Sequence, residues 1–417
     1  MNERQFYTQI FGIQSPWTVS DVALDVKRAE VVVRVDADPE ASLGCPECGN
    51  ASPRYDKRTR RWRHLDTCQF MTIIESDVPR VTCAEHGVLQ VRVPWAEPNS
   101  GFTALFECLV IHWLQHASIT AVKQLCRLGW GQVDTIMTRA VARGLARRKP
   151  EAPERVGVDE TSFQRRHEYV TAVVDLDRPR VLHVADDRKE QSLSGYFDKL
   201  SPAQRAAIKV VAMDMWRPYI NVVRRELPDG DAKIAFDKFH VASHLGDAVD
   251  RVRRLEHREL RAEGDDTLKG SKYLWLMNPS NMTDPVHVAT FEALRALSLK
   301  TARAWAFKEA AMCLWHYVSP GHARNTWRRW IAWARRSKLE PIKRVAAMVR
   351  DHLRGIVTAI VTRTTNAASE SINAKIQWIK RTACGFRNRE RFRNAIYFHL
   401  GGLDMVPASC RVTHTNQ

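Results

Sequence analysis

The segment IKVVAMD, residues 208–214, is an almost continuous apolar run that ends in one acidic residue, Asp214. Runs of this length are typical of strands that are buried on both faces of a sheet. A second strand-like segment, RVGVDETSF, residues 155–163, carries Asp159 in its middle. The two segments therefore predict a sheet in which two buried strands each present a carboxylate.

The neighbouring segments give the order of the elements. Further strands are predicted at YVTAVVDL (169–176), RVLHVADD (180–187) and AKIAFDKFH (232–240), and helices at SLSGYFDKLSPAQRAA (192–207) and PYINVVRREL (218–227). Three strands, a helix, a strand, a helix and a strand are the order of a ribonuclease-H-like fold, whose first and fourth strands lie side by side. Asp159 and Asp214 are then expected to face each other across adjacent strands.

Two carboxylates that lie this close repel each other unless a cation lies between them. Their oxygen atoms are hard ligands, which favour Mg²⁺ or Mn²⁺. The alternative is that each is an ordinary surface aspartate at a strand end, as Asp186 and Asp187 are expected to be. The apolar strands that lead into Asp159 and Asp214 favour the metal site.

A third carboxylate, Glu370, lies in a helical segment that opens with TTNAASESINAKIQWIKRT from residue 364, where Asn366 is predicted to cap the helix. On a helical wheel one face carries Glu370, Asn373, Gln377 and Arg381, and another carries Ile372, Ile376 and Ile379, which can pack on a sheet. Basic residues continue along the polar face, as a phosphodiester substrate requires. The alternative is a solvated glutamate.

Two short motifs near the N-terminus have the spacing of metal ligands. GCPECGN contains Cys45 and Cys48, and VTCAEHGV contains Cys83 and His86; each pair has two residues between its members and a glycine after it. Together they form a Cys3His set that suits a structural Zn²⁺ ion.

The region between the two motifs is predicted to be β-structure. FMTIIES (70–76) and VPRVTC (78–83) read as two strands that return the second motif to the first. His64 and Cys68 lie between the motifs and can substitute as ligands. The alternative is a set of scattered buried cysteines without a metal.

Residues 101–150 are predicted to form three helices, with Ser118 as the N-cap of the second and LGWG as the turn before the third. A short glycine-containing turn between two short helices is typical of a DNA-binding helix-turn-helix, although a plain three-helix bundle has the same pattern. The formal net charge of +17 in 417 residues favours a polyanionic partner, in particular nucleic acid.

The chain between FDKFH and NAASE reads as helix after helix. Trp327, Trp330 and Trp333 recur there at helical spacing among arginines. They form either a core stripe or a platform on which a splayed DNA end stacks.

The motifs CPECG, CAEHG, VGVDETSF, VVAMDMWRPY, FDKFHV and TNAASESINAKIQWIKRTACGFRNRERFRN follow one another over nearly the whole chain. A chain with these motifs resembles the DDE transposases of bacterial insertion sequences, in the branch called the ISL-three family. The most specific part is MDMW, followed by DKFH and by a late N-x-x-x-E-x-x-N. The sequence departs from the family at His86, where a cysteine is more usual.

The resemblance implies a catalytic triad of Asp159, Asp214 and Glu370 in a ribonuclease-H-like core, with an all-helical insertion before Glu370. It also implies DNA cleavage and strand transfer at the ends of the element. Such a triad is expected to use two Mg²⁺ (or Mn²⁺) ions, with Asp159 bridging both and the other two carboxylates each completing one. No covalent enzyme intermediate is required.

Three further residues are expected beside the triad. His240 either orients a phosphate or a flipped base, or caps its strand; Trp216 either stacks on a base or closes the fold; Asn373 shares the face of Glu370. DNA contacts are expected from basic residues of the third helix and of the C-terminal segment: Arg139, Arg143, Arg147, Arg148, Lys375, Lys380, Arg381 and Arg387.

These predictions describe a multidomain α+β protein. Its expected domains are a zinc-binding domain (1–100), a helix-turn-helix domain (101–150), a ribonuclease-H-like core in two parts (151–245 and 363–417, the second with the basic C-terminal segment) and an all-helical insertion (246–362). No apolar run approaches a membrane span and the first residues lack a signal-peptide core, so we expect a cytoplasmic protein without a membrane partner, associated with the nucleoid when it binds DNA. The expected partners are double-stranded DNA, as terminal inverted repeats and target, and at least one further copy of the chain, because two ends must be brought together.

Two other functions stay open from the sequence. One is a zinc and helix-turn-helix DNA-binding regulator whose ribonuclease-H-like core is inactive, and the intact set of three carboxylates argues against it. The other is a stand-alone metal nuclease, which inverted repeats flanking the gene would distinguish from a transposase.

Overall fold

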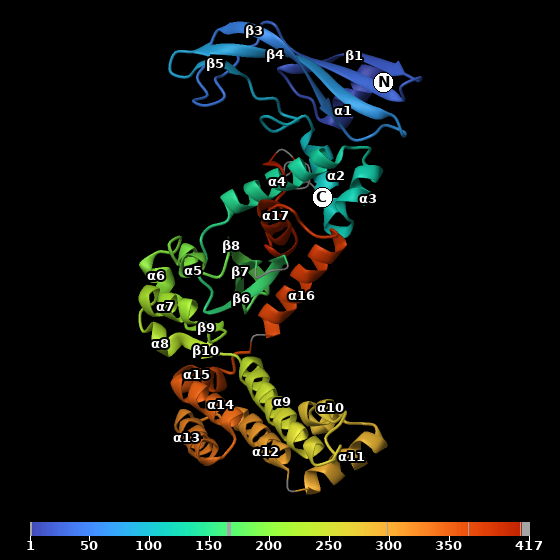
Figure 1. Ribbon diagram of the computed structural model, residues 1–417. Helices are drawn as coiled ribbons and strands as arrows, with labels where there is room; N and C mark the ends of the chain where they lie inside the picture. Colours follow the sequence, from blue (N-terminus) through green and yellow to red (C-terminus); the bar gives the residue numbers. More distant parts are fainter. Residues whose placement is uncertain (1, 165–167, 298, 366, 409, 411–417) are drawn as a thin grey trace. The chain divides into compact units, whose positions relative to one another are not determined.

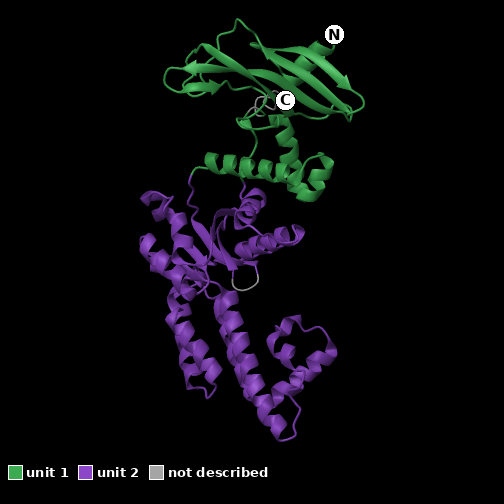
Figure 2. Cartoon of the chain, turned by 45° about the horizontal axis from the view of Figure 1, so that its top comes forward, with its two compact units in different colours: residues 1–149, 403–417 green, residues 150–402 purple. Residues whose placement is uncertain are grey.

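The computed structural model describes residues 2–164, 168–297, 299–365, 367–408 and 410, and Asn366, the predicted helix cap, lies outside them. The chain divides into two compact units, residues 1–149 with 403–417 and residues 150–402 (Figure 2). The segment 363–417, predicted as one part of the core, is therefore divided after residue 402. No helix within the described residues is both long and apolar enough to cross a membrane.

The first unit contains a five-stranded sheet with the strand order β1-β2-β4-β3, in which β5 pairs with the end of β4 (Figure 1). Its elements are α1 (Glu3–Phe11), β1 (Trp17–Asp25), β2 (Glu30–Ala37), β3 (Arg54–Arg63), β4 (Met71–Cys83) and β5 (Gly87–Gln90). The prediction of two strands within 70–83 is wrong: they form the single strand β4, because β3 pairs with it without a break from Ile73 to Arg80.

Three tryptophans close the core of this sheet. The ring of Trp95 lies edge-on against Trp17 and Trp62, with centroids 5.0 and 5.5 Å apart. All three side chains are buried. Aromatic rings of this size supply much of the apolar contact in a small sheet, and here they support a sheet whose β3 strand is exposed from residue 54 to residue 61.

Three helices follow in the first unit, as predicted: α2 (Ala104–His116), α3 (Ile119–Leu125) and α4 (Trp130–Arg147). Ser118 is the N-cap of α3, and its hydroxyl accepts a hydrogen bond of 3.3 Å from the Ala121 amide. The short connection after α3 holds the predicted LGWG turn, of which Leu128 and Gly129 precede α4.

The second unit is built on a sheet with the strand order β10-β9-β6-β7-β8. The strands are β6 (Arg155–Gln164), β7 (Glu168–Asp175), β8 (Arg180–Asp186), β9 (Val210–Met213) and β10 (Ile234–Phe236). β6 is antiparallel to β7 and parallel to β9, so the first and fourth strands lie side by side as predicted.

Helices cover both faces of this sheet (Figure 1). On one face the Tyr219 hydroxyl of α7 (Arg217–Glu226) lies 2.8 Å from the Thr171 hydroxyl of β7. On the other, Gln377 of α16 (Ala367–Thr382) donates to the Thr161 hydroxyl of β6 at 2.5 Å. Helices α5 (Glu190–Phe197) and α17 (Arg389–Leu400) also pack on the sheet, while the short helices α6 (Pro202–Ala207) and α8 (Gly230–Lys233) precede β9 and β10. The helix predicted at 192–207 is in fact the pair α5 and α6, because Ser201 caps a new helix that begins at Pro202.

Helices fill the chain between β10 and α16. They are α9 (Lys238–Ala262), α10 (Lys272–Leu276), α11 (Pro285–Ala296), α12 (Lys300–Cys313), α13 (Pro320–Arg336), α14 (Glu340–Asp351) and α15 (Leu353–Thr362). Within α13, Trp327 and Trp330 are 0% and 4% exposed and belong to the core. Trp333 is 44% exposed, and its ring packs on Phe307 with centroids 3.9 Å apart.

Candidate functional site

Strands β6 and β9 bring Asp159 and Asp214 to the same level of the second sheet. The strands are parallel neighbours with Gly157 opposite Ala212, and each aspartate lies two residues further along its chain. Asp214 directly follows Met213, the last residue of β9. The two carboxylates therefore lie beside each other, Asp159 in the middle of β6 and Asp214 just past the end of β9.

Burial sets the properties of Asp159. Its carboxylate accepts hydrogen bonds from the Glu160 amide at 2.8 Å and from Asn373 Nδ2 at 2.7 Å. Burial raises the pKa of Asp159 to about 6, and the charge of Asp214 adds to the rise. At neutral pH two ionised carboxylates lie in one poorly solvated place, and a bound cation would relieve their repulsion.

Helix α16 carries Glu370 next to this pair. Glu370 is exposed, and Asn373, which bonds to Asp159, lies one turn further along the same helix. The helix begins very close to β6: a Cβ atom added to Gly157 would overlap the Ser369 hydroxyl and lie 2.7 Å from Leu176 Cδ2. The absence of a side chain at Gly157 therefore lets the residue before Glu370 lie against the strand that carries Asp159.

The structure corrects the predicted place of His240. The strand β10 ends at Phe236, and Asp237 caps α9 by accepting a hydrogen bond of 3.2 Å from the Phe239 amide, so that His240 lies in the first turn of the helix. The side chain nonetheless reaches the site, because His240 Nδ1 lies 3.6 Å from Asp214 Oδ1.

Asp237 is a fourth carboxylate that sequence reasoning did not select. It is 3% exposed, and its Oδ2 is buried without a hydrogen-bond partner in the part of the chain that the structure describes. Burial raises the pKa of Asp237, and Asp214 adds to the rise. The available signal was its position at the end of an apolar strand, the pattern that singled out Asp214.

The carboxylates form an open site, not a closed cluster. Over the described ranges, one group of three or more His, Cys, Asp or Glu residues has ligand atoms that all lie within 4.8 Å of one another, and it contains none of these aspartates. Glu370 in particular does not complete such a group. The hard oxygen ligands, the raised pKa of Asp159 and the unpartnered oxygen of Asp237 nevertheless fit a divalent cation.

The closed group is the predicted zinc set, Cys45, Cys48, Cys83 and His86. Cys48 Sγ lies 3.7 Å from Cys83 Sγ, and His86 Nδ1 lies 3.5 Å from Cys83 Sγ and 3.9 Å from Cys45 Sγ. Tetrahedral Zn²⁺ with metal–ligand distances of about 2.0–2.3 Å requires ligand atoms about 3.5–3.8 Å apart. The four side chains therefore stand at the separations that the ion needs.

Two glycines make the turns of this zinc set. Gly49 and Gly87 have φ angles of +77° and +70°, which residues with a side chain rarely adopt. Each follows a ligand pair and lets the chain turn back at once. The imidazole of His86 lowers the pKa of the Cys83 thiol to about 6, as suits a thiolate ligand.

The two substitute ligands lie outside the zinc set. His64 is buried, and its Nδ1 lies 2.8 Å from the Thr103 hydroxyl. Cys68 is exposed. The site therefore uses the four residues with regular spacing.

The arginines predicted to bind DNA from α4 make contacts inside the first unit. Arg139 and Arg143 both pair with Glu107 of α2, which is 1% exposed, and Arg147 pairs with Asp404 at 3.4 Å. Glu107 interrupts the apolar, buried face of α2, and a carboxylate in that position indicates a cationic partner inside the protein. These ion pairs connect α4 to α2 and to the C-terminal segment of the same unit.

The solvent-facing side of α4 has a different composition. Gln132, Thr135 and Ala142 are exposed there, and Arg148 is half-buried at the C-cap. In a helix-turn-helix the first residues of the second helix contact the edges of the bases. Gln132 and Thr135 are the polar side chains in that position.

The basic residues predicted on and after α16 remain at the surface. Lys375, Arg381 and Arg387 are exposed, while Lys380 donates to the Ser162 carbonyl of β6 at 3.0 Å. Trp216, predicted beside the triad, is half-buried, and its indole donates to the Arg188 carbonyl at 3.0 Å.

Three family models match the chain in the order of these sites. A zinc-finger model of the transposases IS204, IS1001, IS1096 and IS1165 matches residues 42–86, and a helix-turn-helix model of transposase family ISL3 matches residues 91–141. The ISL3 transposase model matches residues 156–396, more than half of the chain. A zinc ribbon, a DNA-binding helix-turn-helix and a transposase domain in one chain define a DNA-transposing enzyme. The chain belongs to the ISL3 family of transposases.

Two named relatives extend over most of the chain. The transposase for insertion sequence element IS1557 of Mycobacterium tuberculosis is 29% identical over 93% of this chain and 93% of its own length. The transposase for insertion sequence element IS1001 of Bordetella parapertussis is 27% identical over 84% of this chain and 86% of its own length. No solved structure was found to match the chain.

Proposed function

We propose that this transposase uses a DDE mechanism, in which it binds the ends of its insertion sequence and catalyses metal-dependent cleavage and strand transfer. The observation that carries this proposal is the placement of Asp159 and Asp214 at one level on adjacent parallel strands, with α16 bonded to Asp159. The strand order β10-β9-β6-β7-β8, with helices on both faces, supports a ribonuclease-H-like core. Helices α9 to α15 then form the all-helical insertion in that core.

Asp159, Asp214 and Glu370 are the residues that would hold two Mg²⁺ or Mn²⁺ ions, and Asp237 lies nearby. When bound, such ions would activate a water molecule or a 3′-hydroxyl as the nucleophile and stabilise the leaving oxygen. The exposed position of Glu370 allows it to approach the two aspartates when DNA is bound.

The side chains around the triad hold it in place. Asn373 donates to Asp159 Oδ2 and thereby fixes the direction of that carboxylate. His240, with Nδ1 at 3.6 Å from Asp214, orients the second aspartate or a phosphate beside it. No covalent enzyme intermediate is required, because the hydroxyl of water or DNA can attack the phosphorus directly.

The remaining parts of the chain position the DNA. We assign recognition of the terminal inverted repeats to the first turns of α4, with Gln132 and Thr135 at the base edges. The structural zinc holds the turns of the first unit, and Lys375, Arg381 and Arg387 contact phosphates of donor and target DNA. Two ends must be joined, so at least two copies of the chain assemble on chromosomal DNA in the cytoplasm.

The test uses the full chain and labelled DNA from the flanks of its gene, with Mg²⁺ and with EDTA. Wild type is compared with Asp214→Asn and with the matched control Asp229→Asn, which changes an exposed aspartate between α7 and α8. We expect metal-dependent nicking at a defined terminus by wild type and the control, and none by Asp214→Asn. Specific binding without cleavage by wild type in Mg²⁺ or Mn²⁺ would contradict the proposal and favour a DNA-binding regulator.

A further inference from the structure

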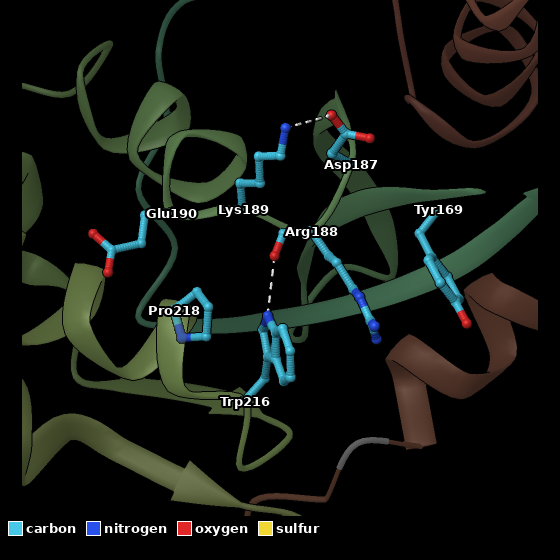
Figure 3. Close-up of a pocket in the computed structure, with 7 residues that line it drawn as sticks. All are labelled: Tyr169, Asp187, Arg188, Lys189, Glu190, Trp216 and Pro218. Atoms are coloured by element: carbon cyan, nitrogen blue, oxygen red, sulfur yellow. Dashed lines mark hydrogen bonds and ion pairs between the residues drawn. The ribbon is translucent and has the colours of Figure 1, made fainter. Parts of the chain in front are cut away.

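A pocket of about 480 Å³ lies in the second unit beside the carboxylate site (Figure 3). It is lined by Tyr169, Asp187, Arg188, Lys189, Glu190, Trp216 and Pro218. The side chains come from β7, from the loop before α5, and from the starts of α5 and α7. Of the residues predicted beside the triad, Trp216 lines this pocket, whereas the triad itself, His240 and Asn373 do not.

The pocket is near Asp214 but on the other face of the sheet from the Asp159 side chain. Successive strand residues point to opposite faces. Asp159 bonds to α16 on one face, so Glu160 points to the other face, where it meets Arg188 at 3.4 Å. Trp216 follows Asp214 by two residues, which places their Cα atoms within about 7 Å of each other.

Arg188 is held rigidly in this pocket. Its guanidinium carbon lies 4.7 Å from the ring centroid of Tyr169 and 4.6 Å from that of Trp216. The Trp216 indole also donates to the Arg188 carbonyl at 3.0 Å, so both the backbone and the side chain of Arg188 are fixed (Figure 3). Aromatic contacts of this kind attract a guanidinium without using its N–H groups.

The N–H groups of Arg188 have little to bind within the protein. Their one recorded partner among the described residues is Glu160, at 3.4 Å, and the Arg188 side chain is 37% exposed. A guanidinium has five N–H donors in a planar fork that matches the oxygens of a phosphate. Arg188 therefore has donors left over and a fixed direction in which to present them.

The carboxylates that line the pocket are neutralised by other cations. Asp187 lies 3.6 Å from Lys189 Nζ and 3.4 Å from Arg389. Glu190 accepts a hydrogen bond of 2.9 Å from Asn221 and pairs with Arg225 at 3.0 Å. Both partners lower the pKa of Glu190, and the hydrogen bond from Asn221 is the largest single cause. Of the described carboxylates near the pocket, Glu160 pairs with Arg188 itself at 3.4 Å, so an anion in the pocket would share the guanidinium with Glu160.

We propose that Arg188 binds one phosphate of the DNA strand as that strand passes from the metal site to the opposite face of the sheet. The proposal rests on the proposed function, because it takes the DNA to be cleaved at Asp159 and Asp214. The pocket gives room for the nucleotide that carries this phosphate. Tyr169 and Trp216 act as positioning residues, which hold the guanidinium in one direction.

The experiment is a thermodynamic cycle between Arg188 and single phosphates. Binding is measured with the full-length Asp214→Asn chain and a flank DNA that contains the end of the insertion sequence, a position read from its terminal inverted repeat. Each phosphate near that position is replaced in turn by an uncharged methylphosphonate, and each DNA is bound by chains with Arg188 or with Arg188→Gln. Arg178→Gln, an exposed arginine in the turn between β7 and β8, is the matched control.

We expect Arg188→Gln to weaken binding about 10- to 100-fold, as the loss of a charge-assisted hydrogen bond to phosphate does. One methylphosphonate should weaken binding to a similar extent in the Arg188 chain and cause no further loss in Arg188→Gln. The dependence of log Kd on log salt should fall by about one unit in that variant. Arg178→Gln should leave all three readouts unchanged.

The proposal would be overturned if, at every phosphate, the loss of affinity from Arg188→Gln and the loss from the methylphosphonate were independent, so that the two fold-changes multiply. Unchanged binding by Arg188→Gln would also overturn it. Coupling to an abasic position instead of a phosphate would also overturn it, since the pocket would then bind a base. If Arg188→Gln lowers the unfolding temperature, Arg188→Lys is used as a second variant, because it keeps the charge without the planar fork. Arg188→Lys should retain part of the coupling between residue 188 and the phosphate. Absence of cleavage by wild type in Mg²⁺ would contradict the proposed function, while the binding cycle still tests the phosphate contact.

Discussion

The zinc set of the first unit and the carboxylate site of the second are built in opposite ways. The four zinc ligands lie within 4.8 Å of one another on two tight turns, whereas the carboxylates of the triad are not gathered into such a group. Asp159 is half-buried with a raised pKa, while Glu370 lies exposed on a helix. A site that only holds a fold can gather all its ligands around the ion, but a site that acts on DNA must leave room for the substrate.

The largest effect should come from opening the closed site. Cys48→Ser removes one of the four ligands, and structural zinc contributes on the order of 10 kcal/mol to the folding of small zinc domains. We expect the zinc content to fall from one ion per chain to none, with loss of the thermal transition of the first unit. Cys68→Ser, which changes an exposed cysteine outside the set, should keep both. A variant at Cys48 that retains zinc would remove the contrast between the two sites.

The open site should respond in activity and not in stability. Glu370→Gln removes a charge that we propose helps to hold the metal ions, and we expect cleavage to fall about a thousandfold, since metal-ion stabilisation of the transition state contributes several kcal/mol. The free energy of unfolding should stay within about 0.5 kcal/mol of wild type, because the side chain is exposed. Glu390→Gln, in the first turn of α17, is the matched control. A large loss of stability in Glu370→Gln would show that this glutamate serves the fold.

Among the described residues, His64 of the first unit and His183 of the second are buried, and they should allow the stabilities of the two units to be distinguished by pH. Burial lowers the pKa of His64 in the first unit and of His183 in the second to about 4. Both are neutral in the folded chain at pH 7 and take up a proton on unfolding below pH 6.5, so the stability they provide is lost as the pH falls toward 4. The loss at pH 5 should be about 2 kcal/mol for each unit.

Urea unfolding at pH 7 and pH 5 checks this, with the two transitions followed separately. His183→Gln should reduce the pH dependence of the second unit by about 2 kcal/mol and leave that of the first unchanged, and His64→Gln should reduce that of the first unit and leave the second unchanged. Equal changes in both transitions would mean that the units do not unfold independently.

The smallest effect should come from the support of Asp159. Asn373→Ala removes the hydrogen bond to Asp159 Oδ2 and should lower cleavage about tenfold, which corresponds to about 1–2 kcal/mol. Asn281→Ala, at an exposed position in the helical part, should not change it. Unchanged cleavage by Asn373→Ala would show that the hydrogen bond from Asn373 is not needed to orient the Asp159 carboxylate.

The sequence allowed the zinc ligands, the strand pairing and the polar face of α16 to be predicted, because each depends on local spacing or on apolar runs. It did not allow the arginines of α4 to be separated from a DNA-binding surface. That distinction depends on Glu107, a distant carboxylate that draws Arg139 and Arg143 inward. The single strand β4 was missed for a similar reason, since its continuity comes from pairing with β3. The contacts of Arg188 with the rings of Tyr169 and Trp216 join three separate segments, and no spacing in the sequence predicts them.

The close contact at Gly157 has a consequence for copies of this gene. Glycine codons become alanine codons by one nucleotide change, and an alanine at 157 would press on Ser369, which is fully buried and has little space to turn. The first turn of α16 would shift, and Glu370 with it, although every carboxylate of the triad would still be encoded. A genome survey that counts only intact triads would therefore classify such a copy as mobile although its transposase had become inactive.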